Sequence, residues 1–301
     1  MTDFTEALIT GNWTHEFIPT NGTRLHVALA GPQDPDATLV VLLHTFPLFW
    51  WQWRNQITFL SELGYRVAAV DLRGYAASDK PPLGYDIPTG SRDIAGVIRS
   101  LGHQDAIIIG HGLGGGPLAW SMPTLQPAVC AGIGIVSCPH PARIHARLRN
   151  SLTRLGKNFL VQVLASNAGR KTWRKTGRLH QLLASWQNRE LSAEVFNRYT
   201  SVLKIPFANK KSVNSLYWFA GAMPFSSGRR FLSVVRTPIT TPTLLVKAED
   251  DRFFHPDLID ADARALCTRL NVVSLAGGHN LPEDSPAELN ETLRTWLSSL
   301  K

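Results

Sequence analysis

The chain has 301 residues, of which 44% are hydrophobic, so it can bury a sizeable core and is not expected to be disordered. Its three cysteines have no CxxC spacing and cannot form a closed disulfide framework, so we expect reduced thiols and a cytoplasmic protein. The first residues lack the basic stretch and apolar run of a signal peptide, and no run of about 18 apolar residues predicts a membrane span.

The predicted elements begin with two short strands at residues 14–19 and 23–29, joined by an Asn21-Gly22 turn. Five later runs are continuously apolar, at residues 38–43, 65–70, 106–109, 131–136 and 243–247. Continuous rather than alternating apolar runs are typical of strands buried on both faces of a parallel sheet. Helical patterns lie between them, at residues 51–63, 87–101 and 116–125. This alternation predicts an α/β fold with a mostly parallel, right-handed, doubly wound sheet.

The alternation of strands and helices stops near residue 140 and returns at residue 243. The intervening stretch is polar and reads as helical, and it contains no strand-like run. We therefore predict a core domain made of residues 1–139 and 238–301, with a helical cap, residues 140–237, inserted into it.

The predicted cap is strongly basic. Between Arg143 and Arg178 there are ten Lys and Arg residues and no Asp or Glu, so this stretch carries more positive charge than the chain's net +8. A surface with charges of one sign favours binding to an anionic membrane, at the inner membrane face, or to an acidic protein. The alternative is that these basic residues form a solvated face without a partner. No nucleic-acid-binding motif is present, so we expect no nucleic-acid partner. The residues assigned to the anionic-surface contact are Arg147, Arg149, Arg154, Lys157, Arg170, Lys171, Arg174 and Lys175.

The strongest local signal is a glycine-rich turn, Ile-Gly-His-Gly-Leu-Gly-Gly, at residues 109–115. It follows a buried apolar run and precedes a helical pattern, which is the setting of a nucleophile elbow that exposes Ser, Cys or Asp. The middle residue here is Gly112, which has no side-chain oxygen or sulfur. A dinucleotide-binding loop is the alternative, but the spacing does not match GxGxxG and at least three predicted strands precede the turn.

Two further blocks accompany this turn. Residues 44–47 and 50–56 read HTFP and WWQWRNQ, and residues 71–81 read DLRGYAASDKP. They resemble the HGFP…WxxWRxQ and DxRGYGxSDxP blocks of epoxide hydrolases and related haloalkane dehalogenases, in the α/β-hydrolase superfamily. The resemblance extends in family order over roughly residues 15–298. It implies an α/β-hydrolase fold with a helical cap.

The resemblance also implies a catalytic acid and a catalytic histidine. Asp251, in the run LVKAEDDR, aligns best with the acid, and Asp250 is the alternative. His279, in a Gly-Gly-His turn, aligns with the histidine. A carboxylate that orients an imidazole is the ordinary arrangement of a general base. The nucleophile position of the family would then be occupied by Gly112.

Other implied site groups come from the backbone and from the cap. The oxyanion hole would be formed by the backbone N–H groups of Phe46 and Leu113. Tyr199 and Tyr217 would be the cap residues that contact a ligand, with structural packing as the alternative. Thr45 stands where the family's oxyanion loop usually has glycine.

With base and acid present and the nucleophile absent, the sequence favours a pseudoenzyme. It would bind a small apolar or lipid-like ligand or act as an accessory protein, in lipid or cell-envelope metabolism. The alternative is a hydrolase or lyase acting on a lipid-like substrate, in which His279 and Asp251 act as a general base without a covalent step. In that case Thr45 is a weak candidate to replace the missing nucleophile. No cofactor and no metal site are expected.

Overall fold

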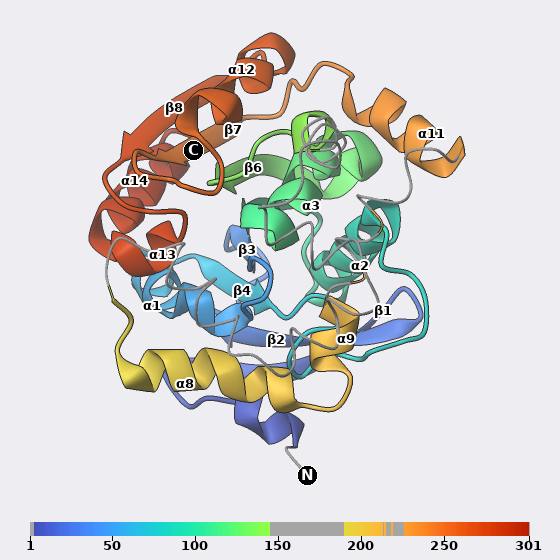
Figure 1. Cartoon of the computed structure of the whole chain (residues 1–301), viewed down its shortest axis with the longest axis vertical. Coiled ribbons are helices and arrows are strands. Elements are labelled where there is room, and N and C mark those ends of the chain that lie inside the picture. Colours follow the sequence, from blue (N-terminus) through green and yellow to red (C-terminus); the bar gives the residue numbers. More distant parts are fainter. Residues whose placement is uncertain (1–2, 145–189, 213, 215–217, 219–225, 301) are drawn as a thin grey trace, which may run out of the picture.

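The structure is a computed structural model that describes residues 3–144, 190–212, 214, 218 and 226–300. Within these ranges eight strands form one sheet in the order β1-β2-β4-β3-β5-β6-β7-β8 (Figure 1). β1 pairs antiparallel with β2, β2 pairs antiparallel with β4, and the later pairs are parallel. The strands are β1 Thr14–Thr20, β2 Thr23–Ala30, β3 Leu39–Leu43, β4 Arg66–Val70, β5 Ala106–His111, β6 Cys130–Val136, β7 Thr243–Ala248 and β8 Leu270–Leu275. The mostly parallel sheet of an α/β fold, as predicted from the sequence, is therefore confirmed.

Helices cover the sheet on both sides. α1 packs with α14, whereas α2 and α11 pack with α3, and Figure 1 shows the two groups on opposite sides of the sheet. The α-helices are α1 Arg54–Glu62, α2 Ile87–Ser100, α3 Gly112–Leu125, α8 Ala193–Ser201, α9 Ala208–Ser212, α11 Ser226–Val235, α12 Pro256–Leu266, α13 Leu281–Asp284 and α14 Pro286–Ser298. Short 3-10 helices are η1 Phe4–Ala7, η2 Trp50–Trp53, η3 Pro127–Val129 and η4 Val202–Lys204. None of the helices in the described ranges has the length and apolarity needed to cross a bilayer.

The burial of the central strands explains why continuous apolar runs in the sequence predicted them. Every residue of β3, β4 and β5 is buried, because helices cover both faces of these strands. β8 was not predicted from the sequence. It lies at the edge of the sheet, only partly buried, and its polar Asn271 and Ser274 interrupt the apolar run.

The chain leaves the sheet between β6 and β7, which are parallel neighbours. In the described part of this connection the regular structure is helical and consists of α8, η4, α9 and α11. The helices contact the core at several points, including a hydrogen bond of 2.9 Å from the Tyr75 hydroxyl to the carbonyl of Ser212 on α9. The boundaries of core and cap stay a prediction.

Candidate active site

The site lies at the carboxyl end of the parallel strands, where β5 turns into α3. Gly112 is the first residue of α3 and has a φ of +50°, a left-handed conformation that glycine adopts without steric cost. The helix starts here, four residues before the predicted start, and the glycines of its first turn let it approach the sheet closely. A Cβ on Gly115 would collide with the backbone carbonyl of Leu43 on β3.

A histidine and an aspartate from two later loops meet beside this turn. The Nδ1 of His279 donates a hydrogen bond of 2.8 Å to the Oδ2 of Asp251, and both side chains are fully buried. The other carboxylate oxygen of Asp251 accepts the backbone N–H groups of Phe253 and Phe254, each at 2.8 Å. The carboxylate thus fixes the imidazole with its proton on Nδ1, which leaves Nε2 as the basic nitrogen. Asp250 is exposed, so the structure places Asp251 rather than Asp250 against the imidazole.

The basic nitrogen of His279 is directed at the glycine. A Cβ built on Gly112 would lie 3.0 Å from Nε2 of His279. The same point is already crowded by the buried side chain of Thr45, whose Cβ lies at 2.8 Å and whose hydroxyl is closer still. Thr45 therefore fills the volume into which a side chain at position 112 would project.

A chain of buried side chains joins the three loops of the site. The backbone N–H of Thr45 donates to Oε1 of Gln52 at 3.1 Å, and Nε2 of Gln52 donates to Nδ1 of His111 at 2.5 Å. His111 then donates from Nε2 to the carbonyl of His279 at 2.8 Å. Sequence reasoning missed Gln52 and His111. Both stand inside motifs that the sequence does reveal, the WWQWRNQ block and the glycine-rich turn.

The two residues predicted for an oxyanion hole lie on either side of this turn. Leu113 is the second residue of α3, so its N–H is among the first four of the helix, which have no partner within the helix. The N of Phe46 lies 3.0 Å from the point where a Cβ on Gly114 would stand, so the loop after β3 approaches the first turn of α3 closely. The oxyanion role of these N–H groups stays a prediction.

Tyr199 of α8 is buried against the core. Its hydroxyl donates to Glu283, which also receives two hydrogen bonds from Arg54, at 2.5 and 2.8 Å. Its ring packs edge-on against Trp51 and Phe49. Burial raises the pKa of Tyr199 well above its usual value, so the hydroxyl keeps its proton. This hydroxyl is engaged in a contact between α8 and α13, and the ligand contact predicted for it stays a prediction.

Several predicted residues fall outside the described residues. They are Tyr217 and the eight residues assigned to an anionic surface, Arg147, Arg149, Arg154, Lys157, Arg170, Lys171, Arg174 and Lys175. Arg143, at the start of the basic stretch, is described and pairs with Asp262 through two hydrogen bonds of 2.5 and 2.8 Å. Within the described ranges no three His, Cys, Asp or Glu side chains are grouped as metal ligands would be.

The arrangement of strands, turn, histidine and acid can be compared with known families. Residues 40–292 match the model of the alpha/beta hydrolase family. The chain belongs to this family. Among the solved structures similar to this alpha/beta hydrolase is epoxide hydrolase A from Mycobacterium thermoresistibile, with a TM-score of 0.81 and 22% identity over 96% of this chain and 99% of that one. That likeness shows the fold.

Curated relatives of this alpha/beta hydrolase include proteins named epoxide hydrolases. Epoxide hydrolase B of Mycobacterium tuberculosis is 41% identical over 43% of this chain and 36% of its own length. The AB hydrolase superfamily protein YfhM of Bacillus subtilis is 45% identical over 42% of this chain and 44% of its own length. The chain thus aligns with less than half the length of these two relatives. Epoxide hydrolase 4 of Mus musculus is 28% identical over 93% of this chain and 78% of its own length.

Proposed function

We propose that this epoxide-hydrolase-like protein has lost the covalent step of its family and acts as a pseudoenzyme. It would bind a small apolar or lipid-like ligand, or serve as an accessory protein, in lipid or cell-envelope metabolism. One observation carries the proposal: at the strand-to-helix turn that faces Nε2 of His279 stands Gly112, which offers no atom for an ester bond.

The side chain of Thr45 supports the same conclusion. A residue with a Cβ at position 112 would collide with Thr45, so glycine at one position and threonine at the other fit each other. A site that has merely lost one functional group would leave a gap at the turn, whereas this volume is filled. In a Ser-His-Asp triad, loss of a member leaves only about 10³–10⁴-fold acceleration over water.

Restoring the elbow tests the proposal. Because Gly112→Asp alone would collide with Thr45, the variant to compare is Gly112→Asp combined with Thr45→Gly, and Thr45→Gly alone is the matched control. Styrene oxide and p-nitrophenyl butyrate serve as substrates. We expect no turnover by the natural chain above that of His279→Ala, and measurable epoxide turnover by the double variant. Turnover by the natural chain that His279→Ala abolishes would contradict the proposal.

A second candidate function is favoured by the intact pair of His279 and Asp251. A buried imidazole that presents Nε2 beside the turn and is held by a carboxylate can take a proton from water or from a carbon acid. The chain would then be a hydrolase or lyase on a lipid-like substrate, without a covalent intermediate. It predicts that activity is lost in both His279→Ala and Asp251→Asn. Unchanged turnover in either variant excludes it.

We also propose that the basic stretch between Arg143 and Arg178 binds an anionic membrane surface. Its ten positive charges and lack of acidic residues support this. Sedimentation with vesicles containing anionic lipid at low and high salt tests it. We expect binding at low salt that weakens at high salt, because screening acts on exposed charges. Absence of binding to anionic vesicles at low salt contradicts it.

A further inference from the structure

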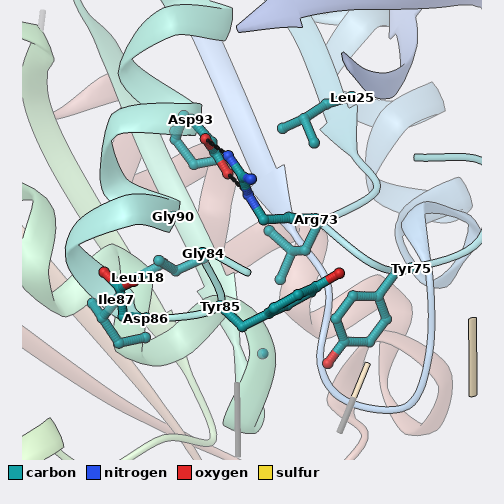
Figure 2. A pocket seen from close by; sticks show the side chains of 13 residues that line it. Leu25, Arg73, Tyr75, Gly84, Tyr85, Asp86, Ile87, Gly90, Asp93 and Leu118 are labelled. Carbon is teal, nitrogen blue, oxygen red and sulfur yellow. Dashed lines mark hydrogen bonds and ion pairs between the residues drawn. The ribbon is translucent and has the colours of Figure 1, made fainter. Parts of the chain in front are cut away.

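A concave site reaches the glycine-rich turn at Gly114 but includes neither the histidine nor the acid. This pocket, whose lining side chains Figure 2 shows, lies between the loop after β4, helix α2 and helix α3. Its volume is about 430 Å³, counting the space open to solvent at its mouth. His279, Thr45 and Gly112 are not among its lining residues. Its walls are mainly apolar and are formed by Leu25, Leu72, Ile87, Ile94 and Leu118, with the rings of Tyr75 and Tyr85.

Most polar side chains of this pocket already form hydrogen bonds with other residues of the protein. The hydroxyl of Tyr85 donates to the carbonyl of Pro81 at 2.7 Å, and that of Tyr75 donates to Ser212. Burial raises the pKa of Tyr85 above its ordinary value, so its hydroxyl remains a donor. The carboxylate of Asp86 caps α2 by accepting two hydrogen bonds from Thr89, at 2.8 and 2.9 Å. The rings of Tyr75 and Tyr85 and the carboxylate of Asp86 therefore contribute to the shape of the pocket rather than an unused hydrogen-bonding group.

Arg73 differs from the other polar residues. Its Nε and one terminal nitrogen bind the two oxygens of Asp93 at 2.7 and 2.6 Å, and the same terminal nitrogen donates to the carbonyl of Asn21 at 3.3 Å. The other terminal nitrogen, Nη1, makes no hydrogen bond to any residue that the structure describes, and it is accessible to solvent. The pocket therefore has one donor that the protein does not use.

Gly84 leaves that donor accessible. A Cβ at position 84 would lie 3.1 Å from Nη1 of Arg73, so a side chain there would press on the guanidinium. Gly84 has a φ of +88°, which glycine alone adopts without strain. In the view of Figure 2, Arg73 and Gly84 both lie above the ring of Tyr85.

We propose that this pocket is a second ligand site, which takes a small neutral molecule with an apolar body and one acceptor oxygen. The apolar walls receive the body, and Nη1 of Arg73 donates to the carbonyl, ether or hydroxyl oxygen. An anionic ligand fits less well, because the lining holds two carboxylates, Asp86 and Asp93, and one guanidinium. The site goes beyond the function proposed for the turn and does not depend on it.

Three probes of the same shape test this chemistry. Acetophenone has the acceptor, ethylbenzene lacks it, and benzoate carries a negative charge. Their dissociation constants are measured by protein-observed NMR, which also locates each probe. We expect acetophenone to shift the signals of Gly84 and Tyr85 and to bind about tenfold more tightly than ethylbenzene, since a hydrogen bond to a charged donor contributes about 1.5 kcal/mol or more. Benzoate should bind more weakly than acetophenone.

Two pairs of variants assign the binding. Arg73→Lys keeps a positive charge beside Asp93 but removes Nη1, so acetophenone should weaken to the affinity of ethylbenzene. Arg92→Lys, on the exposed face of the same region of α2, is its control and should change nothing. Leu118→Phe fills the pocket and should weaken both probes at least tenfold. Leu125→Phe, on the same helix but outside the lining, is its control, and thermal unfolding verifies that each variant is folded.

Clear outcomes overturn the inference. They are equal affinity for acetophenone and ethylbenzene, a preference for benzoate, or unchanged selectivity in Arg73→Lys. Signals that shift around His279 instead of Gly84 also overturn it, and they leave the function proposed for the turn standing. If Leu118→Phe fails to fold, the comparison of Arg73→Lys with Arg92→Lys still decides the question.

Discussion

At the scale of single residues, a chain of hydrogen bonds leads from the carbonyl of Ile9 through His15 and His26 to Asp71. Nε2 of His15 donates to the carbonyl of Ile9 at 2.9 Å, and Nδ1 of His15 is hydrogen-bonded to Nε2 of His26, also at 2.9 Å. Nδ1 of His26 is hydrogen-bonded to Oδ2 of Asp71 at 2.8 Å. The chain of hydrogen bonds therefore ends on a buried carboxyl group.

Asp71 is the group on which this chain of hydrogen bonds ends. Burial alone would raise the pKa of Asp71, but its hydrogen bonds with His26 and with the backbone N–H of Trp50 help to hold that pKa below its usual value. Asp71 is therefore a carboxylate, with Oδ1 accepting the N–H of Trp50 and Oδ2 accepting the N–H of Ala77. We predict that Asp71→Asn lowers the free energy of unfolding by about 1–3 kcal/mol in urea titrations, because an amide has only one acceptor oxygen for these donors. An unchanged free energy of unfolding would contradict this role of the carboxylate.

At the scale of elements, Gln52 of η2 connects the loop after β3 to the end of β5. Replacing it with leucine leaves the N–H of Thr45 and Nδ1 of His111 buried without their partner. Each such loss costs about 1–3 kcal/mol, so we predict that Gln52→Leu lowers the free energy of unfolding by about 2–6 kcal/mol in urea titrations. Gln56→Leu is the control. Gln56 makes one hydrogen bond, to Asn290, so its replacement should cost about half as much. Equal losses in the two variants would show that the Gln52 bridge contributes nothing specific.

The same elements show how far the sequence leads. Continuous apolar runs located the buried strands because helices cover both of their faces, whereas the partly exposed edge strand β8 has no such signal. The order of the motifs along the sequence was enough to predict that His279 and Asp251 lie together beside the turn at Gly112. It could not show that Thr45 fills the volume beside Gly112, because that contact depends on how closely two loops approach in space. The Gln52 bridge was missed for the same reason.

At the scale of the whole molecule, three fully buried histidines from different parts of the fold are held neutral. His44, His111 and His140 each accept an N–H on one ring nitrogen and donate to a carbonyl from the other. For His140 the carbonyl is that of Val235 and the N–H is that of Ala142. Burial lowers the pKa of all three, that of His140 to about 4.

These depressed values make the fold sensitive to acid. Between pH 6.5 and about 4 the unfolded chain binds a proton at His140 that the folded chain does not, so stability falls as the pH falls. The complete shift corresponds to roughly 3 kcal/mol. We predict that His140→Gln, which keeps a donor and an acceptor, flattens the loss of unfolding free energy between pH 7 and 4 by about this amount. Unfolding titrations at several pH values measure it, and an unchanged slope would contradict the assignment.

The central claim is that the turn at Gly112 carries no nucleophile. Intact-protein mass spectrometry after quenching with styrene oxide or p-nitrophenyl butyrate present tests it most directly. Removal of the base traps an ester formed on a carboxylate, whereas a hydroxyl such as that of Thr45 needs the base to take its proton. The informative set is therefore the natural chain, His279→Ala in the natural chain, and His279→Ala added to Gly112→Asp with Thr45→Gly. We predict an epoxide adduct at position 112 of the third protein and no adduct on the first two with either substrate. A stoichiometric adduct on either of the first two proteins would show that a nucleophile exists, and the account would be wrong.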